Sequence, residues 1–278
     1  MRRWIPLFRM VWMQIFLMVN DFSIDEFLGG RLKIKQPLRG YRAGVDPVLL
    51  AASVNAYEGE DILDLGCGVG VASLCLSQRV SGLNIYGIEI QSDYAALASE
   101  NSKLNSLDLN IINANIANLP EFLRQMQFDH IIANPPYFDG LSSTSSFNEG
   151  RDTSRVINTP LADWVLVMAQ RLKQKGWAHL IYRVDRFDKL FPLLNARFGS
   201  FVLTPIVPRV GRDAELIIIH MRKSGKAALR LESPLCLHEG VKHLADCNDY
   251  TNKVEDILRG RGELTSWIKN NKLNARNL

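Results

Sequence analysis

The sequence predicts an α/β fold in which a mostly parallel sheet carries helices on both faces. From Asp61 onward, short runs of β-branched and aliphatic residues alternate with longer stretches in which apolar residues recur at every third or fourth position. A glycine-rich turn follows the first of these runs, and the last two runs are joined by a segment that contains Pro208 and Gly211. We therefore expect a seven-stranded sheet that ends in an antiparallel C-terminal hairpin.

The expected strands are short, and most are followed by an amphipathic stretch of helical length. Lys173 and Lys175, just before Gly176, are typical of the C-terminal end of a helix. We expect strands at about 61–65, 84–89, 109–113, 128–133 and 177–182, helices near 70–80, 92–104, 117–126 and 160–174, and the hairpin from 200–207 and 214–222.

Three segments of the chain differ in composition. Residues 1–20 are an N-terminal extension that is largely apolar from Trp4, but Arg9 interrupts the apolar run and no signal-peptide cleavage site follows it. This extension is either a targeting segment or the result of a start codon assigned too early, and we leave it out of the fold. Residues 21–223 form one large domain, and residues 224–278 form an appended C-terminal segment.

The composition narrows the class of protein. The 278 residues are 47% hydrophobic and 22% charged, which excludes a disordered, collagen-like or coiled-coil chain. The four cysteines form no C-x-x-C pair, so neither a disulfide framework nor a zinc ribbon is indicated, and a reducing cytoplasm fits best. The formal net charge of +4 permits a polyanionic partner without identifying one.

The glycine-rich turn predicts a cofactor site. It lies directly after a strand and opens a helix, and Glu89 ends the next strand 19 positions after Gly70. Glycine permits positive φ angles and lets a ligand approach the backbone closely, while Glu89 lies where a carboxylate can accept hydrogen bonds from both ribose hydroxyls. Val71 stands where the dinucleotide fingerprint requires a small residue, so a pyrophosphate ligand is disfavoured. The candidate residues of the turn are Asp64, Gly66, Gly68 and Gly70.

The D-x-G-x-G-x-G form of this turn resembles the first motif of the Rossmann-like, class I methyltransferases that depend on S-adenosyl-L-methionine. The resemblance implies that this cofactor, which has a ribose and an adenine but no phosphate, binds at the turn and at Glu89. In that class the third strand ends in a polar residue that meets the adenine amino group. Asn115 is the matching residue, in place of the more usual aspartate, and a turn-forming role is its alternative interpretation.

The tetrapeptide Asn134, Pro135, Pro136 and Tyr137 follows the fourth expected strand. Two consecutive prolines cannot extend a strand, so the backbone leaves the sheet in a fixed form at the carboxyl edge, where ligands bind in open α/β sheets. The tetrapeptide resembles the N-P-P-Y motif of methyltransferases that act on a planar nitrogen, which is either an exocyclic amine of a base or a glutamine amide.

The residue types of this motif suit that reaction. A planar nitrogen is a poor nucleophile because its lone pair is delocalised, and it must become pyramidal to attack the methyl group. The side-chain oxygen of Asn134 and the carbonyl oxygen of Pro135 would accept its two N–H groups and stabilise the developing positive charge. Tyr137 offers a face on which a base can stack, a contact worth about 1 to 3 kcal/mol. We therefore assign the catalytic role to these residues with Pro136, without a general base.

Residues 41–52, YRAGVDPVLLAA, resemble the segment before the glycine turn in the tRNA1(Val) adenine-N6 methyltransferase family and its small-ribosomal-RNA relatives. Asp46 is a candidate N-cap of a helix with Pro47 at its first position, and by resemblance it lies beside the cofactor. Parts of the stretch 235–258 are also similar to that family. The resemblance implies methyl transfer to the exocyclic amino nitrogen of an adenine in RNA, with a tRNA as the expected partner.

Two basic segments, residues 31–42 and 222–230, contain no acidic residue. We expect them to flank a cleft and to contact an RNA backbone; a solvated basic surface is the alternative. The serine-rich segment 142–146 and the two arginines that follow it are expected to form a lid over an extruded base. The candidate RNA-binding residues are Arg39, Arg42, Arg151, Arg155, Arg222 and Lys223.

Cys236, His238, His243 and Cys247 are of residue types that bind zinc, but their spacing matches no standard zinc finger. We expect neither a metal nor a membrane partner.

Three other functions stay open. A protein glutamine methyltransferase of the release-factor type carries the same N-P-P-Y motif, but that family places a helical domain before its glycine turn, whereas only residues 21–63 precede it here. A ribosomal guanine-N2 methyltransferase is the second alternative. The third is a non-catalytic RNA-binding module, against which the intact Asp64, Glu89 and Asn134 argue.

Overall fold

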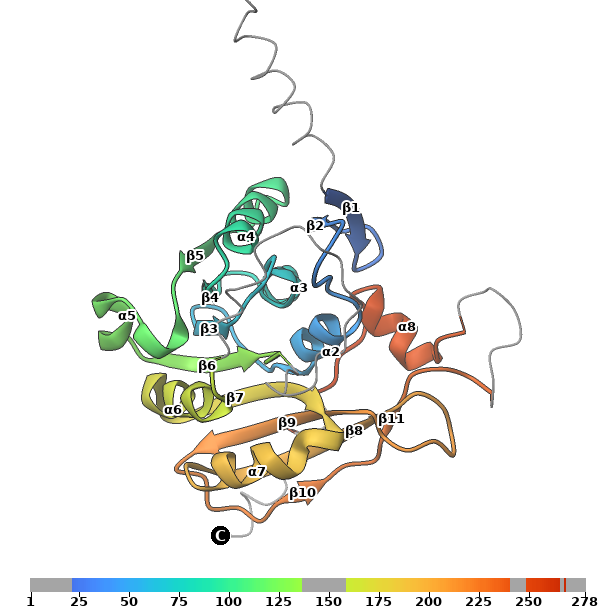
Figure 1. Ribbon diagram of the computed structural model, residues 1–278. Helices are drawn as coiled ribbons and strands as arrows, with labels where there is room; N and C mark the ends of the chain where they lie inside the picture. Colours follow the sequence, from blue (N-terminus) through green and yellow to red (C-terminus); the bar gives the residue numbers. More distant parts are fainter. Residues whose placement is uncertain (1–21, 137–158, 241–248, 266–267, 269–278) are drawn as a thin grey trace, which may run out of the picture.

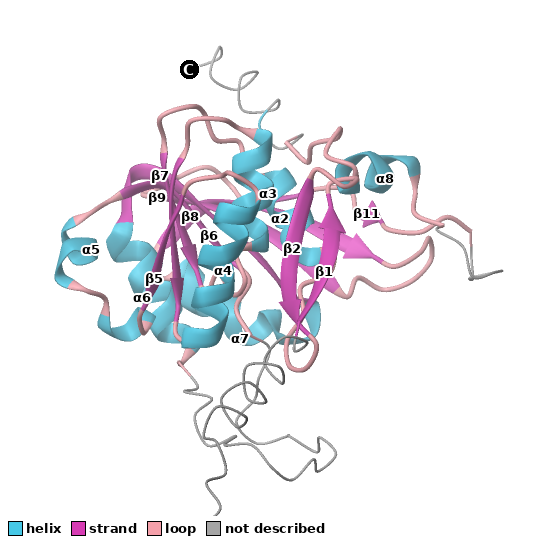
Figure 2. Cartoon of the chain, turned by 90° about the horizontal axis from the view of Figure 1, so that it is seen from above, coloured by secondary structure: helices cyan, strands magenta, loops and turns pink. Residues whose placement is uncertain are grey.

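The computed structural model describes residues 22–136, 159–240, 249–265 and 268, which fold into a sheet with helices on both faces (Figures 1 and 2). Within this described part the large sheet has nine strands, in the order β10-β8-β9-β7-β6-β3-β4-β5, and β11 pairs with β8. A separate hairpin is formed by β1 and β2.

The strands are β1 (Phe22–Phe27), β2 (Leu32–Pro37), β3 (Asp61–Leu65), β4 (Asn84–Glu89), β5 (Leu109–Asn113), β6 (Phe128–Ala133), β7 (Leu172–Arg183), β8 (Phe198–Val207), β9 (Leu216–Lys223), β10 (Arg230–Leu231) and β11 (Leu235–Cys236). The α-helices are α2 (Asp46–Ser53), α3 (Val71–Arg79), α4 (Ser92–Leu104), α5 (Glu121–Gln125), α6 (Leu161–Arg171), α7 (Phe187–Asn195) and α8 (Asn252–Leu258), and two short 3-10 helices are η1 (Ile116–Asn118) and η2 (Val184–Arg186).

The pairing of the strands confirms the predicted fold class. Strands β3 to β7 are all parallel to one another, whereas β9 is antiparallel to both β7 and β8. The predicted number of seven strands is too low, because β10 and β11 add two residues each, parallel to β8. Strands of two residues have no hydrophobic period, and only their hydrogen bonds to β8 define them.

The expected helix over 160–174 ends earlier than predicted, at Arg171, and β7 begins at the next residue. Lys173, Lys175 and Gly176 therefore do not end a helix. They lie in an irregular part of β7, where the register shifts between Phe128 and His130 of β6 and Lys175 has a φ of 64°. A Cβ at Gly176 would meet the carbonyl oxygen of Asp129 at 2.8 Å, so glycine is required for this close approach.

Several elements were not predicted or differ from the prediction. The expected helix over 117–126 is divided into η1 and α5 at Pro120. Helix α7 contains Pro192, which is atypical of a helix interior. The C-terminal segment contributes α8, whose Val254 and Ile257 are fully buried against the core. None of the described helices is long and apolar enough to cross a membrane.

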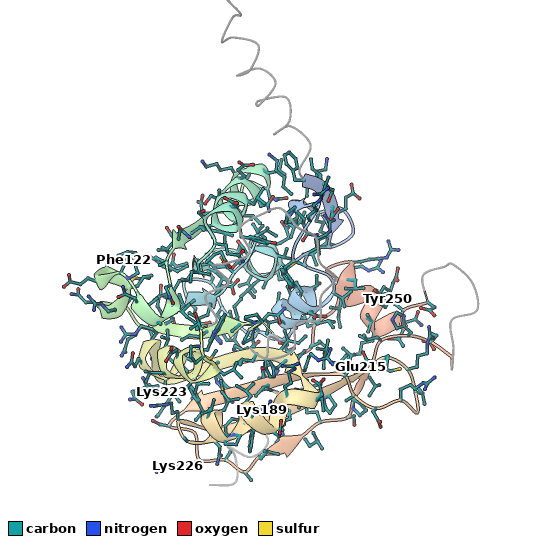
Figure 3. The ribbon with its side chains drawn as sticks, in the orientation of Figure 1. Phe122, Lys189, Glu215, Lys223, Lys226 and Tyr250 are labelled. Carbon is teal, nitrogen blue, oxygen red and sulfur yellow. The ribbon has the colours of Figure 1, made fainter. Side chains whose placement is uncertain are left out.

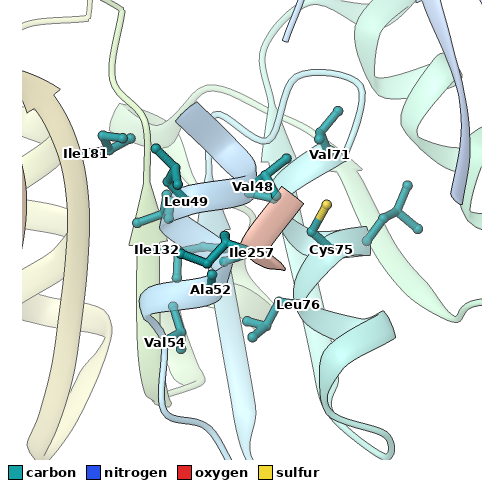
Figure 4. Close-up of a cluster of buried hydrophobic side chains, with 14 of the residues drawn as sticks. Val48, Leu49, Ala52, Val54, Val71, Cys75, Leu76, Ile132, Ile181 and Ile257 are labelled. Atoms are coloured by element: carbon teal, nitrogen blue, oxygen red, sulfur yellow. The ribbon is translucent and has the colours of Figure 1, made fainter. Parts of the chain in front are cut away.

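The core has two parts, one on each face of the sheet. The part formed with α2, α3 and α8 includes Leu49, Cys75, Ile132 and Ile257, which meet in one cluster of buried side chains (Figure 4). On the other face, the buried residues of α6 and α7 pack against β6 to β9. Both faces of the central strands are thus buried, which explains their continuous apolar runs.

The β1–β2 hairpin is attached to α4 by two asparagines one helical turn apart. Asn101 accepts a hydrogen bond from the backbone N–H of Lys35 at 2.7 Å and donates to the carbonyl oxygen of the same residue at 3.0 Å. Asn105 makes the same pair of bonds with Lys33, both at 2.8 Å. The side chains thus satisfy backbone groups at the edge of β2, and Asn101 also donates to the carbonyl oxygen of Val69 in the glycine turn.

Three buried histidines form a row across β6, β7 and β9. Nδ1 of His130 lies 2.9 Å from Nε2 of His179, and Nδ1 of His179 lies 2.7 Å from Nδ1 of His220. Nε2 of His130 lies 3.1 Å from Oε2 of Glu60, at the half-buried end of the row. Burial, followed by the neighbouring histidines, holds the pKa of His179 well below its usual value, and burial lowers the pKa of His220 to about 3.

Candidate active site

The glycine turn leaves β3 at the carboxyl edge of the sheet and leads into α3. Gly66 has a φ of 67°, and a Cβ there would lie 2.5 Å from the ring of Trp164 in α6, so the turn needs glycine for its conformation and for its packing. Gly68 has a φ of 57°, and no atom lies within 4 Å of the position that its Cβ would occupy. Gly70 precedes the first turn of α3. The turn therefore exposes backbone that a ligand can approach closely.

Two carboxylates lie beside this turn. Asp64, which is 2% exposed, accepts a 2.7 Å hydrogen bond from the hydroxyl of Ser73, and burial raises its pKa to about 7, with Glu89 contributing. Glu89 ends β4 and accepts hydrogen bonds from the backbone N–H groups of Gly68 at 3.0 Å and Gln91 at 2.8 Å. These bonds hold the Glu89 carboxylate in place, and each oxygen keeps a further lone pair for a ligand hydroxyl.

Asn115 caps the N-terminus of η1, where its side-chain oxygen accepts a hydrogen bond from the backbone N–H of Ala117 at 2.9 Å. The turn-forming role that we considered for this residue is therefore present. The contact of Asn115 with an adenine remains a prediction. The same oxygen has a second lone pair, which can accept a hydrogen bond from the adenine amino group.

Neighbouring Asn113 was not singled out from the sequence. It ends β5 and donates hydrogen bonds to the carbonyl oxygens of Glu89 and Ile90 at 2.9 and 3.0 Å. These hydrogen bonds hold the end of β4 in place, and Glu89 is the last residue of that strand.

The Asn134-Pro135-Pro136 segment leaves the sheet next to the glycine turn. Ala133, the last residue of β6, pairs with Leu65, the last residue of β3. Gly66 and Asn134 are the next residues along the chain, so they lie at neighbouring strand ends. Asn134 is half-buried, Pro135 is buried and Pro136 is exposed. Tyr137, Arg151 and Arg155 lie outside the described residues.

Tyr41 is a site residue that sequence reasoning missed. The amide nitrogen of Asn134 donates a long hydrogen bond of 3.5 Å to its hydroxyl oxygen, across 93 positions of the chain. The hydroxyl of Tyr94 in α4 donates to the Tyr41 carbonyl oxygen at 3.1 Å and fixes this part of the loop. Although 55% of Tyr41 is exposed, burial of its hydroxyl end, followed by the carboxylate of Asp46, raises its pKa to about 12. Tyr41 therefore stays a neutral phenol.

Asp46 is the first residue of α2 and does not cap it as predicted. The capping position belongs to Val45, without a side-chain hydrogen bond, and Pro47 is buried in the first turn. The predicted cap position is one residue too late in the chain, because a proline in the first turn is compatible with several cap positions. Burial raises the pKa of Asp46, and its electrostatic effect on the hydroxyl of Tyr41 indicates that the two side chains lie near each other.

The basic segments do not flank one cleft. Arg42 pairs with Asp25 at 2.6 Å and also donates to the carbonyl oxygen of Pro37, while Arg39 is exposed. In contrast, Arg222 pairs in register with Trp177, which lies opposite His130 near the start of β6. Arg222 and Lys223 therefore lie at the amino edge of the parallel strands, away from Asn134. Spacing along the chain could not predict this separation, because it depends on the antiparallel direction of β9.

No group of three or more metal-ligating side chains that could hold a metal ion occurs among the described residues. His238 contacts the carboxylate of Asp249 at 2.7 Å and stacks on Tyr250, and the thiol of Cys236 is directed to the carbonyl oxygen of His238. His243 and Cys247 lie outside the described residues.

Comparison with known proteins assigns a class to this arrangement. The family model of the methyltransferase small domain matches residues 44–200. The chain is 31% identical to a tRNA1(Val) (adenine(37)-N6)-methyltransferase of Haemophilus influenzae, over 74% of this chain and 88% of that protein. It is 32% identical to a protein of the same name from Yersinia pseudotuberculosis, over 72% of this chain and 80% of the relative.

Solved structures share the fold. A predicted O-methyltransferase of Agrobacterium tumefaciens has a TM-score of 0.62 at 24% identity, over 78% of this chain and 97% of the other. The T. Thermophilus 16S rRNA N2 G1207 methyltransferase, in complex with AdoMet and guanosine, has a TM-score of 0.53 at 21% identity, over 73% of this chain and 50% of the other.

Proposed function

The chain belongs to the tRNA1(Val) (adenine(37)-N6)-methyltransferase family within the methyltransferase small domain class, and from this premise we propose that it methylates the exocyclic amino nitrogen of an adenine in tRNA, with S-adenosyl-L-methionine as the methyl donor. A tRNA substrate also favours the cytoplasm as its location.

One observation carries the proposal: the glycine turn and the Asn134-Pro135-Pro136 segment start from paired strand ends. Leu65 and Ala133 are partners in the sheet, so the residues that follow them emerge side by side. Neighbouring strands in a sheet are about 4.8 Å apart, which suits a cofactor and an acceptor that must exchange a methyl group. This edge is also where open α/β sheets bind ligands.

The residues around the turn fit S-adenosyl-L-methionine. The space next to Gly68 accommodates a ligand, and the Glu89 carboxylate is fixed in a position to accept hydrogen bonds from a ribose. When bound, this cofactor supplies an electrophilic methyl group on a positively charged sulfur. The residues proposed to hold it are Asp46, Asp64, Gly66, Gly68, Gly70, Glu89 and Asn115.

On the acceptor side, Asn134 and Pro135 would accept the two N–H groups of the adenine amine. Their oxygens bind the nitrogen more strongly as it becomes pyramidal and positive, which lowers the barrier to attack. Pro136 keeps the backbone of the segment rigid, and Tyr137 would stack on the base. Tyr41 accepts a hydrogen bond from the Asn134 amide nitrogen, which orients the amide oxygen of Asn134 away from Tyr41.

The substrate RNA would be held mainly through its phosphates. Arg39 is exposed on the loop that carries Tyr41, and we propose that it contacts the backbone close to the target nucleotide. Arg151 and Arg155 are proposed to act with it. The guanidinium of Arg42 is bound to Asp25, so its contribution would be to hold this loop against β1.

The test is to identify the labelled nucleoside. The protein is incubated with methyl-tritiated cofactor and total RNA from a strain that lacks the gene, and the RNA is digested and separated. We expect N6-methyladenosine from the tRNA fraction, and no label with Asn134→Ala. Labelled N2-methylguanosine, or label in protein instead of RNA, would assign the enzyme to another acceptor.

A further inference from the structure

Basic side chains from three separate segments meet at the amino edge of the sheet. Arg124 lies in α5, Arg171 ends α6, Lys175 lies in the irregular part of β7, and Arg222 and Lys223 end β9. In Figure 3, Lys223 and Phe122 of α5 are both labelled on the left side of the molecule, where α5 leads into β6. We call these five residues the amino-edge basic cluster: Arg124, Arg171, Lys175, Arg222 and Lys223.

The hydrogen bonds of the cluster go to neutral groups. Arg171 donates to the carbonyl oxygens of Leu123 and Met126, both at 3.4 Å, and Lys223 donates to that of Leu172 at 2.7 Å. Arg222 donates to the carbonyl oxygen of Lys175 at 2.8 Å. These bonds hold the positive groups in place without neutralising them.

In the part of the chain that the structure describes, no member of the cluster forms an ion pair, whereas Arg42, Arg209 and Arg230 elsewhere pair with carboxylates. Lys173 is at the same edge but is paired with Asp61 and Asp129, so it is not part of the cluster.

The members of the cluster also repel one another. Burial and then the charge of Arg124 lower the pKa of Arg171, and burial and then the charge of Arg171 lower the pKa of Lys223. The repulsion between these positive charges lowers the stability of the free protein, and a bound anion relieves it.

A pocket of about 420 Å³ opens at this edge beside two members of the cluster, and it is also lined by Glu60 and Asp129, whose carboxylates contact His130 and Lys173. Lys175, Trp177 and Arg222 are among the residues that line it, and the guanidinium carbon of Arg222 lies 5.5 Å from the centre of the Trp177 ring. The stacking limits the movement of Arg222 and keeps its remaining N–H groups available for a planar or tetrahedral anion.

The cluster is too far from the acceptor site to contact the target nucleotide. Leu172 pairs with Phe128 at the start of β6, and Asn134 follows the other end of this six-residue strand. At about 3.3 Å per residue, the two sites are about 20 Å apart. This distance corresponds to several nucleotides of RNA, so the cluster can contact only phosphates outside the target nucleotide.

We propose that the amino-edge basic cluster binds the phosphate backbone of a second region of the same folded tRNA whose adenine enters the acceptor site. The proposal rests on the proposed function. It implies that the enzyme recognises the folded tRNA at two separate places. The proposed second region lies outside the stem-loop that carries the target adenine, so the isolated stem-loop lacks it.

The experiment compares two substrates: the full-length tRNA and its isolated stem-loop with the same adenine. The test variant is Arg124→Gln with Lys175→Gln, because both side chains are exposed and make no hydrogen bond with another described residue. The matched control is Lys253→Gln, an exposed lysine of α8. Dissociation constants at several salt concentrations and kcat/KM are measured for both substrates.

We expect the double variant to bind full-length tRNA about tenfold more weakly, with a salt slope lower by about two units, and to treat the stem-loop as the unaltered protein does. Arg222→Gln should act in the same direction, and the control should change neither substrate. No loss, or an equal loss for both substrates, would overturn the proposal and leave the proposed function intact. If the unaltered protein methylates neither substrate, the proposed function itself fails.

Discussion

The orientation of the Asn134 amide decides what this residue can do. An amide has an accepting oxygen and a donating nitrogen on the same carbon, and only the oxygen can receive an N–H group of an adenine. Because the nitrogen donates to the hydroxyl of Tyr41, the oxygen is on the opposite branch of the amide. We therefore propose that Tyr41 positions the Asn134 amide.

Substitutions at Asn134 and Glu89 should have separate effects, the first on methyl transfer and the second on cofactor binding. Asn134→Ala removes an acceptor for the reacting nitrogen, so we expect no measurable transfer and a cofactor dissociation constant within a few-fold of the original. Glu89→Ala should weaken cofactor binding by about 1 to 3 kcal/mol, because hydrogen bonds from the ribose to a carboxylate are lost. Calorimetric titration with the cofactor measures both. A large loss of cofactor affinity in Asn134→Ala would remove this residue from the acceptor site.

Tyr41→Phe should lower kcat and leave KM for RNA almost unchanged. The loss of one hydrogen bond to Asn134 corresponds to about 0.5 to 1.5 kcal/mol, or roughly a two- to tenfold decrease in kcat. Tyr94→Phe is the control, because it removes the bond to the Tyr41 backbone and leaves the Tyr41 hydroxyl in place. An increase in KM without a change in kcat would show that Tyr41 contacts the RNA instead.

At the scale of elements, the sequence predicts β3, β4, β5, β6 and α4 at the bounds found in the structure. Each of these is a continuous apolar or amphipathic segment bounded by polar residues or turns. The end of α6 was not predictable in the same way, because Lys173, Lys175 and Gly176 are equally typical of a helix end. Their place in β7 depends on pairing with β6.

The residues of the candidate site divide in the same way, into those that the sequence reveals and those that depend on how the chain folds. Residues that end a strand or directly follow it, such as Glu89 and Asn134, are visible in the sequence because the carboxyl ends of parallel strands share one edge. Tyr41 was missed because its contact with Asn134 depends on how a loop folds back over the sheet. The location of Arg222 was missed because it depends on the direction of β9.

Asn101 should be a major determinant of the stability of the β1–β2 hairpin. The residue is fully buried and satisfies backbone groups of Lys35 and Val69. We expect Asn101→Ala to lower the free energy of unfolding by about 2 to 4 kcal/mol, because buried backbone groups lose their partners. Asn105→Ala, at a half-exposed position, should cost about 1 kcal/mol. Urea unfolding gives both values, and equal losses would contradict the importance of burial here.

At the scale of the whole molecule, buried ionisable groups should determine how stability depends on pH. His179 and His220 have lowered pKa values, so their contribution to stability is present above the unfolded value of 6.5 and is lost as the pH falls. Asp64 acts in the opposite direction. Its raised pKa of about 7 means that its contribution is present below pH 3.8 and is lost as the pH rises toward 7.

Between pH 5 and 6 the lowered pKa values of the two histidines outweigh the raised pKa of Asp64, so the free energy of unfolding should rise with pH. Asp64→Asn should make this slope steeper, and His220→Asn should make it shallower. Urea unfolding at several pH values measures the slope. If His220→Asn leaves the slope unchanged, the row of histidines does not titrate as described.

The histidine row has a further consequence for the positions of its protons. Glu60, whose pKa is lowered mainly by its hydrogen bond with His130, is an acceptor at neutral pH, so a neutral His130 ring carries its proton on Nε2. His179 must then donate from Nε2 to His130, and His220 from Nδ1 to His179. The half-buried end of the row thus selects the tautomer of a ring two strands away. Nitrogen-15 spectra should show this pattern, and Glu60→Gln, whose amide can donate, would permit the reverse pattern in all three rings.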